Sequence, residues 1–321
     1  MNLPPVEGPK IGPFKHSGSK LNIKFLQEIG EGDDSWVWKV GIDGGIYALK
    51  VFKFDTDPEP IHPMQRQRFR ELGITDESVI LHAWDPFASE CRAYGRLKEI
   101  NKPDIAAACY GYLFLSTKNN NSLDGADFTE LEWVEIRDWK HDAGKPKALI
   151  RTLVKEYIES ESPFSPGMVP KMLRNIKLLH KYGIVHRDIR EDNYREGLLV
   201  DFSIALTVPH FLLDLKLGYN QLEEIYDYDV GDGYAFDSMI NDWSADNNIK
   251  IWQRFLPNTR YRKCLRSERS GKEQDSKFCT PTNALLEARM EVHRKIRDRI
   301  KWHAADYDWK KGKQMKSRKI I

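Results

Sequence analysis

The feature that most constrains the fold of this chain is a polar run between an amphipathic helix pattern and a strand pattern. The run is His186-Arg187-Asp188-Ile189-Arg190-Glu191-Asp192-Asn193, and Asp201 follows after seven intervening residues. A carboxylate such as Asp188 can accept or orient the proton of an attacking hydroxyl group. An amide and a second carboxylate, here Asn193 and Asp201, suit a divalent metal ion that bridges phosphates. These side chains are suited to acid–base and metal-binding chemistry, and the alternative is an ordinary polar turn after a helix.

This run resembles the catalytic loop of the protein-kinase superfamily, H-R-D-x-x-x-x-N, and Asp201-Phe202-Ser203 resembles its D-F-G motif. The resemblance implies that Asp188 is the catalytic base and that Asn193 and Asp201 bind Mg²⁺. It also implies that Arg190, two positions after Asp188, steadies the transferring phosphate. The cofactors expected on this basis are ATP and Mg²⁺.

A glycine-containing turn near the N-terminus is similar to the kinase glycine-rich loop, G-x-G-x-x-G-x-V. The turn is Ile29-Gly30-Glu31-Gly32-Asp33-Asp34-Ser35-Trp36-Val37. Glycines let a backbone come close to phosphate oxygens, and the resemblance assigns Gly30, Gly32 and Val37 to nucleotide binding. Asp33 and Asp34 place negative charge beside the expected phosphates. A plain hairpin turn is the alternative interpretation.

Ala48-Leu49-Lys50 resembles the family's V-A-I-K strand motif. The resemblance implies that Ala48 borders the nucleotide and that Lys50 reaches its phosphates. The kinase lysine also pairs with a glutamate on a helix, and Glu90 is the candidate here. A surface salt bridge or a solvated lysine is the alternative.

Lys155-Glu156-Tyr157-Ile158 is similar to the segment that joins the two kinase lobes. The resemblance implies that adenine bonds the backbone carbonyl of Glu156 and the backbone N–H of Ile158. It places Lys155 at a position that is usually uncharged, from which this lysine could compete with Lys50 for Glu90.

Several features depart from the kinase pattern after the catalytic loop. Ser203 replaces the glycine of D-F-G, and no A-P-E motif follows. Thr207-Val208-Pro209-His210 comes almost at once, so the predicted activation segment is short and offers little platform for a peptide substrate. The chain between Asn193 and Asp201 is predicted to form a tight hairpin that turns at Glu196-Gly197.

Hydrophobic periodicity predicts the secondary structure. Strands are expected at 21–29, 36–40, 46–52, 110–115 and 149–158, and helices at 87–100, 169–179 and 283–302. Residues 55–86 and 116–149 read as irregular insertions. A strand-rich half followed by a helix-rich half predicts an α+β, two-lobed, protein-kinase-like fold, in which an antiparallel-sheet N-lobe with one main helix precedes a mostly helical C-lobe.

The expected domain boundaries follow from these patterns. They are a flexible leader at 1–20, an N-lobe at 21–158, a helical C-lobe at 159–303 that diverges from kinases after about 205, and a basic tail at 304–321. The tail is read as a solvated terminus, with a nuclear localisation signal or a nucleic-acid contact as the alternative.

Composition narrows the environment and the partners. The 321 residues include 50 basic and 48 acidic side chains, and the formal net charge of +2 implies no strong electrostatic partner. Four cysteines without a C-x-x-C pair argue against a zinc site or a disulfide framework. No apolar run is long enough to span a bilayer, so an intracellular protein, nuclear or cytoplasmic, is expected.

A narrower resemblance concerns fungal kinase-like proteins. The run 186–194, together with 199–203 and 90–97, is similar to a group placed with the Fta-type subunit of an inner-kinetochore complex. This resemblance implies kinetochore partners. Three functions stay open: an ATP- and Mg²⁺-dependent phosphotransferase with a Ser/Thr hydroxyl as acceptor, an inactive pseudokinase or scaffold subunit of a kinetochore assembly, and a small-molecule kinase of the aminoglycoside-phosphotransferase kind.

Overall fold

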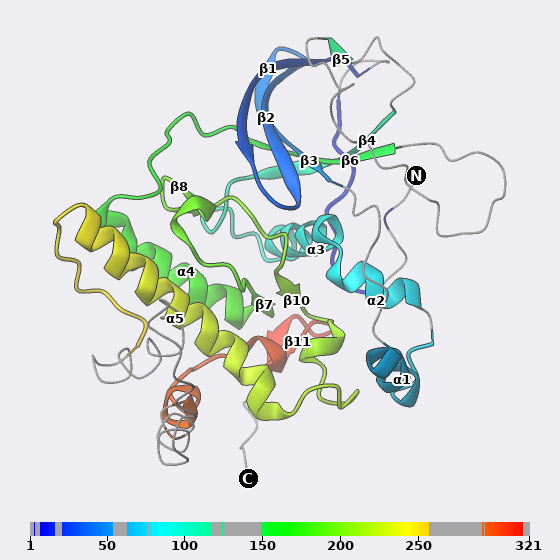
Figure 1. The fold of residues 1–321 in the computed structure, drawn as a ribbon, viewed down its shortest axis with the longest axis vertical. Helices are drawn as coiled ribbons and strands as arrows, with labels where there is room; N and C mark the ends of the chain where they lie inside the picture. Colours follow the sequence, from blue (N-terminus) through cyan, green and yellow to red (C-terminus); the bar gives the residue numbers. More distant parts are fainter. Residues whose placement is uncertain are drawn as a thin grey trace, which may run out of the picture. The chain divides into compact units, whose positions relative to one another are not determined.

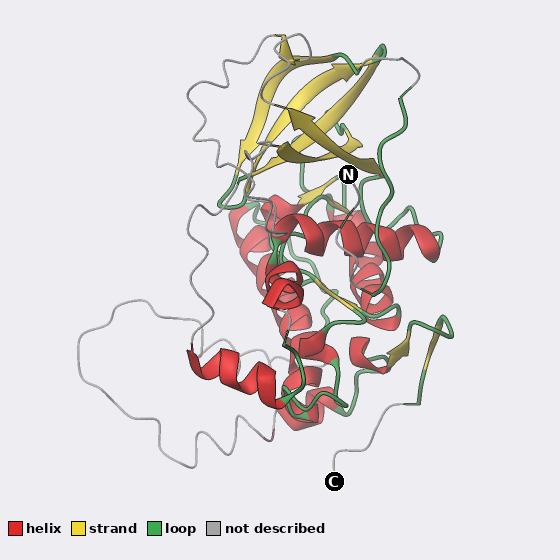
Figure 2. Cartoon of the chain, turned by 90° about the vertical axis from the view of Figure 1, so that its right-hand side faces the viewer, coloured by secondary structure: helices red, strands yellow, loops and turns green. Residues whose placement is uncertain are grey.

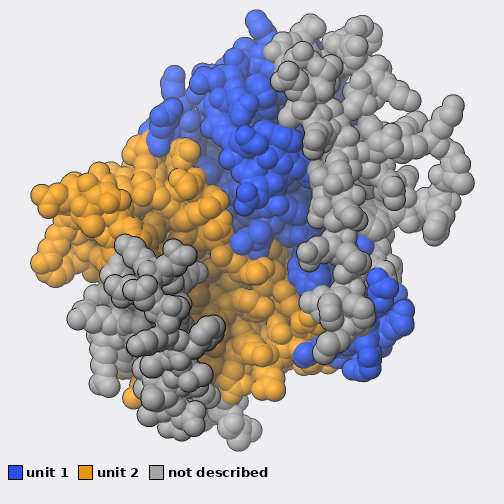
Figure 3. Space-filling view, viewed as in Figure 1, with its two compact units in different colours: residues 1–161, 198–204 blue, residues 162–197, 205–321 orange. Residues whose placement is uncertain are grey.

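The computed structural model describes residues 3, 7–16, 21–53, 63–75, 77–116, 123–124, 149–256, 291 and 293–316. The chain divides into two compact units, coloured separately in Figure 3. Unit 1 contains residues 1–161 and 198–204, and unit 2 contains residues 162–197 and 205–321. Strands and helices occur together (Figure 2), so the predicted α+β class is confirmed.

Unit 1 is built on an antiparallel sheet of five strands in the order β4-β6-β3-β2-β1, with the short β5 parallel to β1 at its edge (Figure 1). Its elements are β1 (Ile23–Glu31), β2 (Ser35–Ile42), β3 (Gly45–Phe52), α1 (Pro63–Glu71), α2 (Glu77–Trp84), α3 (Pro86–Glu99), β4 (Cys109–Ser116), β5 (Leu123–Asp124), β6 (Leu149–Glu156) and β9 (Leu198–Leu199). The five strands predicted for this part of the chain are confirmed, as is the helix that became α3.

Both faces of the sheet are covered, which explains why β3 is buried continuously from Ala48 to Phe52. One face carries a core cluster that includes Leu49 and Val51. On the other face Phe52 packs edge-on against Phe87 of α3, with 5.3 Å between ring centroids. Side chains alternate across a strand, so Lys50 shares the α3 face with Phe52.

The prediction of an irregular segment at 55–86 was wrong, because its described part contains α1 and α2. Pro63 is the first residue of α1, where a proline costs no helical hydrogen bond. Pro63 and Pro86 were therefore helix start signals rather than signs of irregular structure. Of the predicted insertion at 116–149, residues 117–122 and 125–148 lie outside the described residues.

Part of the segment expected to be a leader runs beside β4 and α3. Phe14 N donates to the Tyr112 carbonyl at 2.9 Å, and Ile11 N donates to the Cys91 carbonyl at 2.9 Å. Gly111 allows this approach, since a Cβ on it would overlap with the backbone at Phe14. These bonds hold residues 11–14 against the edge of the sheet.

Unit 2 is dominated by two long helices that lie side by side, α4 and α5 (Figure 1). Its elements are η2 (Pro166–Met168), α4 (Val169–Lys181), β7 (Ile184–Val185), η3 (Glu191–Asn193), β8 (Tyr194–Arg195), β10 (Leu206–Thr207), η4 (Phe211–Leu213), α5 (Leu222–Asp246), η5 (Ala304–Asp306), β11 (Tyr307–Asp308) and β12 (Lys313–Gln314). The predicted helix at 169–179 is confirmed as α4. A turn at Glu196-Gly197, where both residues have positive φ, is also confirmed.

The helix α5 was not predicted. Its start carries a capping box, in which the Glu224 side chain accepts from Gln221 N at 2.8 Å. Three aspartates interrupt the apolar stripe of the helix and are nevertheless buried: Asp229, Asp232 and Asp237. Because the hydrophobic pattern treats aspartate as a surface residue, the stripe was not recognised.

The C-terminal region differs from its sequence-based description. Of the helix predicted at 283–302, residues 283–290 and 292 lie outside the described residues, and 293–297 are helical, so the helix ends before Trp302. Within the segment expected to be a basic tail, β11 pairs with β12. Gln314 Nε2 donates to the carbonyls of His180, Lys181 and His303. No helix in the described ranges is both long and apolar enough to cross a membrane.

Candidate functional site

A buried ion cluster in unit 1 surrounds Lys50, which is 2% exposed. Its Nζ lies 2.8 Å from Glu90 Oε2 on α3 and 2.7 Å from Asp201 Oδ1, two residues after β9. The N-terminus of α3 is capped by Asp85, whose carboxylate accepts from Ala88 N at 3.1 Å. The structure thus brings three of the predicted site residues together: Lys50, Glu90 and Asp201.

Lys50 and Asp201 stabilise each other's charged form. Burial by itself lowers the pKa of Lys50, but the carboxylates of Glu90 and Asp201 outweigh it and raise this pKa above its ordinary value. Burial acts to raise the pKa of Asp201, but Lys50, Lys155 and a bond from Ser203 N hold it below its usual range. Lys50 is therefore protonated and Asp201 ionised at neutral pH.

A second lysine completes the cluster. Lys155 comes from β6, the strand next to β3, and is 4% exposed. Its Nζ forms a close ion pair with Glu90 Oε1 and donates to the Val200 carbonyl at 2.8 Å. Two lysines thus face Glu90 and Asp201, and the buried charges balance within the protein. A balanced cluster has little uncompensated positive charge to offer a phosphate group.

Asp34 adds negative charge at the turn between β1 and β2. Burial raises its pKa, Lys50 acts in the opposite direction, and the carboxylates of Asp201 and Asp33 raise it further. Asp34 therefore lies within electrostatic reach of the lysine cluster. A carboxylate in this position competes with phosphate oxygens for Lys50.

The predicted glycine-rich loop is the β1–β2 turn. Gly30 lies in β1 beside a register shift, and Gly32 N donates to the Ser35 carbonyl at 2.9 Å. A Cβ on Gly30 would lie 4.0 Å from Val37 Cβ, and one on Gly32 would lie 3.9 Å from the Ser35 carbonyl oxygen. Both are ordinary contacts, so packing among the described residues does not require glycine at either position. Val37 is the register partner of Lys50.

The segment predicted to bind adenine ends β6. Ala48 pairs in register with Lys155. Glu156 N donates to the Ala108 carbonyl at 2.8 Å, and Ala108 N donates to Glu156 Oε2 at 3.0 Å. Ile158 follows the strand and is partly buried. The pair with Ala108 uses neither of the backbone groups predicted to bond adenine.

In unit 2, α5 holds the predicted catalytic loop. Asp232 Oδ2 accepts from His186 N at 2.8 Å, and Asp232 Oδ1 accepts from Arg187 N at 2.7 Å. Arg187 has a φ of 69°, a conformation that costs of order 1–3 kcal/mol and persists where surrounding bonds over-determine it. Asp232 supplies such bonds. The sequence analysis missed this residue because it missed α5.

Asp188 is held by two other predicted residues. Asn193 Nδ2 donates to Asp188 Oδ2 at 2.7 Å and to the Asp188 carbonyl at 2.9 Å. Arg190 Nε lies 3.2 Å from Asp188 Oδ2, although the Arg190 side chain is 61% exposed. Asp188, Arg190 and Asn193 therefore form a second group of predicted residues, which belongs to unit 2.

The two predicted Mg²⁺ ligands, Asn193 and Asp201, belong to different units. Their chemistry fits the metal, since an amide and a carboxylate supply the oxygen ligands that Mg²⁺ prefers. Within the ranges that the structure describes, no group of three or more His, Cys, Asp and Glu residues is placed to hold a metal ion.

A buried polar network behind the loop was not anticipated from the sequence. His180 Nε2 of α4 lies 3.0 Å from Asp232 Oδ2, and His303 Nδ1 lies 2.8 Å from Asp229 Oδ2. Burial lowers the pKa of His180, but Asp229 and Asp232 outweigh it and raise this pKa above its ordinary value. The signal in the sequence was the spacing of the aspartates Asp229 and Asp232 at three positions, which puts them on one face of a helix. That this face is buried is known only from the structure.

Comparison with known families identifies the chain. The profile of the family described as "Kinetochore Sim4 complex subunit FTA2" matches residues 1–206, which is more than half of the 321 residues. The matched range contains both groups of predicted site residues. A search of curated proteins found no match. The chain belongs to the kinetochore Sim4 complex subunit FTA2 family.

Proposed function

We propose that this chain is a protein-binding subunit of a nuclear kinetochore assembly of the Sim4 type, and that its core is a scaffold. The family description supports this, because it names a complex subunit and no reaction. One observation on the chain itself carries the proposal: Glu90 forms ion pairs with both Lys50 and Lys155.

Electrostatics favours the scaffold over a transferase. A nucleotide phosphate entering beside Lys50 would meet Asp34 and Asp201. At about 4 Å, one like-charge pair costs about 1 kcal/mol in water and more where water is excluded. Lys50 would have to leave one of its two carboxylates, either the fully buried Glu90 or Asp201, whose side chain is 29% exposed. The cluster therefore stabilises the fold of unit 1, because its ion pairs link the sheet to α3 and to the segment that follows β9.

We further propose that the two units correspond to the lobes of a protein-kinase-like fold, with a sheet-rich lobe at 21–158 and a helical lobe at 159–303. What supports this within unit 1 is the five-stranded antiparallel sheet with α3 on its Lys50 face. What supports it within unit 2 is the loop carrying Asp188, which is held by α5.

An ATP-dependent phosphotransferase is the second candidate. Two observations favour it: the set Lys50, Asp188, Asn193 and Asp201 is complete, and packing does not account for Gly30 and Gly32. When bound, Mg²⁺ would neutralise charge on the phosphates. Asn193 and Asp201 would hold it, Lys50 would contact the phosphates, and Asp188 would orient the acceptor hydroxyl.

The test compares the full-length wild type with Asp188→Asn. We expect both to co-elute with the other Sim4-type subunits when produced together, and Mg²⁺–ATP to leave the melting temperature of either unchanged. A nucleotide at about 100 times its Kd would add about 2.7 kcal/mol, a clear shift. Mg²⁺-dependent stabilisation together with phosphoryl transfer that Asp188→Asn abolishes would establish the second candidate instead.

A further inference from the structure

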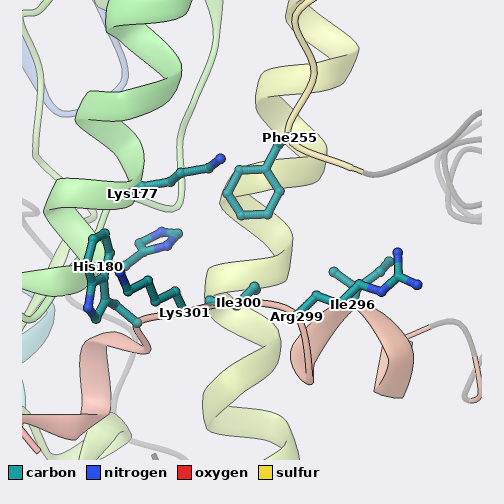
Figure 4. A pocket seen from close by; sticks show the side chains of 8 residues that line it. Lys177, His180, Phe255, Ile296, Arg299, Ile300 and Lys301 are labelled. Carbon is teal, nitrogen blue, oxygen red and sulfur yellow. The ribbon is translucent and has the colours of Figure 1, made fainter.

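A cavity of about 230 Å³ lies in unit 2, between α4, the segment after α5 and residues 296–302 (Figure 4). Its floor is apolar and consists of Phe255, Ile296, Ile300 and Trp302. Ile296 is buried in a core cluster against which Phe255 and Ile300 pack. Pockets for cofactors and drug-sized ligands measure about 300–1,000 Å³. The cavity is therefore sized for an apolar side chain rather than for a whole cofactor.

Contacts with α5 hold Phe255, one of the floor residues, in place. The Asp237 carboxylate accepts from Phe255 N at 2.6 Å and from Leu256 N at 3.0 Å. The ring of Phe255 packs directly on Gly233, where a Cβ would overlap with it. Because Phe255 is already held in place, binding a ligand costs less conformational entropy.

Three exposed cations surround the floor: Lys177, Arg299 and Lys301. Lys177 extends from α4 toward Phe255 (Figure 4), with its Nζ 5.7 Å from the ring centroid. Lys301 Nζ lies 4.6 Å from the centroid of the Trp302 ring. The rim is therefore positively charged, while the floor is aromatic and aliphatic.

No aspartate or glutamate is among the residues that line the cavity in the described part of the chain. The remaining lining residue, His180, is buried and has Asp232 on its other side. The carboxylates behind His180 are matched inside the protein, since Asp232 also accepts from two backbone N–H groups and Asp229 pairs with His303. The charge offered to a ligand is thus that of Lys177 and Lys301.

We propose that this pocket binds an acidic peptide segment of a partner protein, with an apolar side chain in the cavity and the flanking carboxylates on Lys177 and Lys301. Charge complementarity and the size of the cavity select this occupant over a nucleic acid, whose phosphates would reach the rim and leave the floor unfilled. The inference rests on the proposed scaffold role, for which it names the chemistry of the partner.

The first test measures fluorescence anisotropy of two labelled peptides, GDEDFEDEG and GDEDNEDEG, with the full-length chain. We expect the phenylalanine peptide to bind at least about tenfold more tightly than its asparagine counterpart, since the aromatic ring fills the cavity. The double change Lys177→Glu and Lys301→Glu is expected to weaken binding at least tenfold. Lys171→Glu, an exposed lysine on the same helix outside the cavity, is expected to change it less than about twofold.

A second variant tests the apolar floor of the cavity independently of the charged rim. Ile300→Phe fills the floor without altering the rim, and we expect it to abolish binding of the phenylalanine peptide while circular dichroism stays unchanged. The proposal is overturned by equal binding of the two peptides, by an equal loss with Lys171→Glu, by full binding to Ile300→Phe, or by preference for a single-stranded oligonucleotide. Failure of co-elution with Sim4-type subunits would remove the scaffold role but not peptide binding, so the two failures are distinguishable.

Discussion

Lys155 determines the charge balance of the ion cluster in unit 1. Glu90 has no exposed surface, and its two carboxylate oxygens pair with two different lysines. Burying charges costs several kcal/mol per ion unless each is matched and hydrogen-bonded. Loss of one lysine would leave the negative charge of Glu90 and Asp201 facing Lys50 alone.

Lys155→Met tests this balance, because methionine keeps the unbranched side chain up to the ε position and removes the charged amino group. We expect the free energy of unfolding to fall by about 3–5 kcal/mol, as for other broken buried pairs, with the Val200 carbonyl also losing its donor. Chemical denaturation measures the change. The matched control is Lys53→Met, which loses a surface pair with Glu31 and is expected to be as stable as the wild type. A Lys155→Met protein with unchanged stability would contradict the balanced cluster.

Sequence motifs located Lys50, Glu90 and Asp201 because each sits in a short pattern with fixed chemistry. The competition from Lys155 could also be anticipated, since its position in the strand was known. The positive φ of Arg187 could not, because it depends on bonds from Asp232, which lies 45 positions further along the chain. A local pattern carries no information about such a distant partner.

At the scale of elements, α5 organises unit 2. Its buried aspartates accept hydrogen bonds from the loop at 186–187 and from the segment at 255–256, and Asp229 pairs with His303 in the C-terminal region. Each acceptor satisfies backbone N–H groups or histidines that would otherwise be buried without partners. The buried face of the helix therefore combines apolar side chains with three aspartates, a mixture that hydrophobic periodicity does not detect.

Two glycines of α5 give a matched pair of substitutions. Gly231 is exposed and has no neighbour within 4 Å of a built Cβ, whereas Gly233 faces the Phe255 ring. We expect Gly231→Ala to stabilise the chain by about 0.5–1 kcal/mol, because alanine is the better helix former. Gly233→Ala has the same propensity gain but overlaps with the ring, and we expect a net loss of about 1–3 kcal/mol. Thermal unfolding of both variants checks this, and equal midpoints would show that Phe255 is free to move.

At the scale of the whole molecule, contacts between segments far apart in the sequence hold unit 2 together. Its polar network runs from His180 of α4 through Asp229 and Asp232 of α5 to His303. Gln314 then donates to the carbonyls at the end of α4. The last carbonyls of a helix have no partners within it, and here the His180 carbonyl accepts from Gly183 N at 3.1 Å as well as from Gln314. The C-terminal segment therefore adds a donor at the end of α4.

This network makes stability depend on pH. The pKa of His180 is raised in the folded state above its ordinary value of 6.5. Its contribution is therefore complete below pH 6.5 and is lost as the pH rises through the folded value. We expect urea denaturation midpoints of the wild type to fall toward alkaline pH more steeply than those of His180→Asn. A difference between the two proteins that is constant from acid to alkaline pH would contradict a charged His180.

The sequence by itself determined the α+β class, the five strands, α3, α4 and the separate motifs of the candidate site. Each of these follows from spacing within a few residues, which fixes backbone geometry locally. Tertiary structure alone decided that both lysines pair with Glu90 at once instead of competing for it, that the aspartates of α5 point inward, and that a cavity lies beside Phe255. These features depend on which distant side chains share a desolvated interior, since a buried charge is stable only beside its partner.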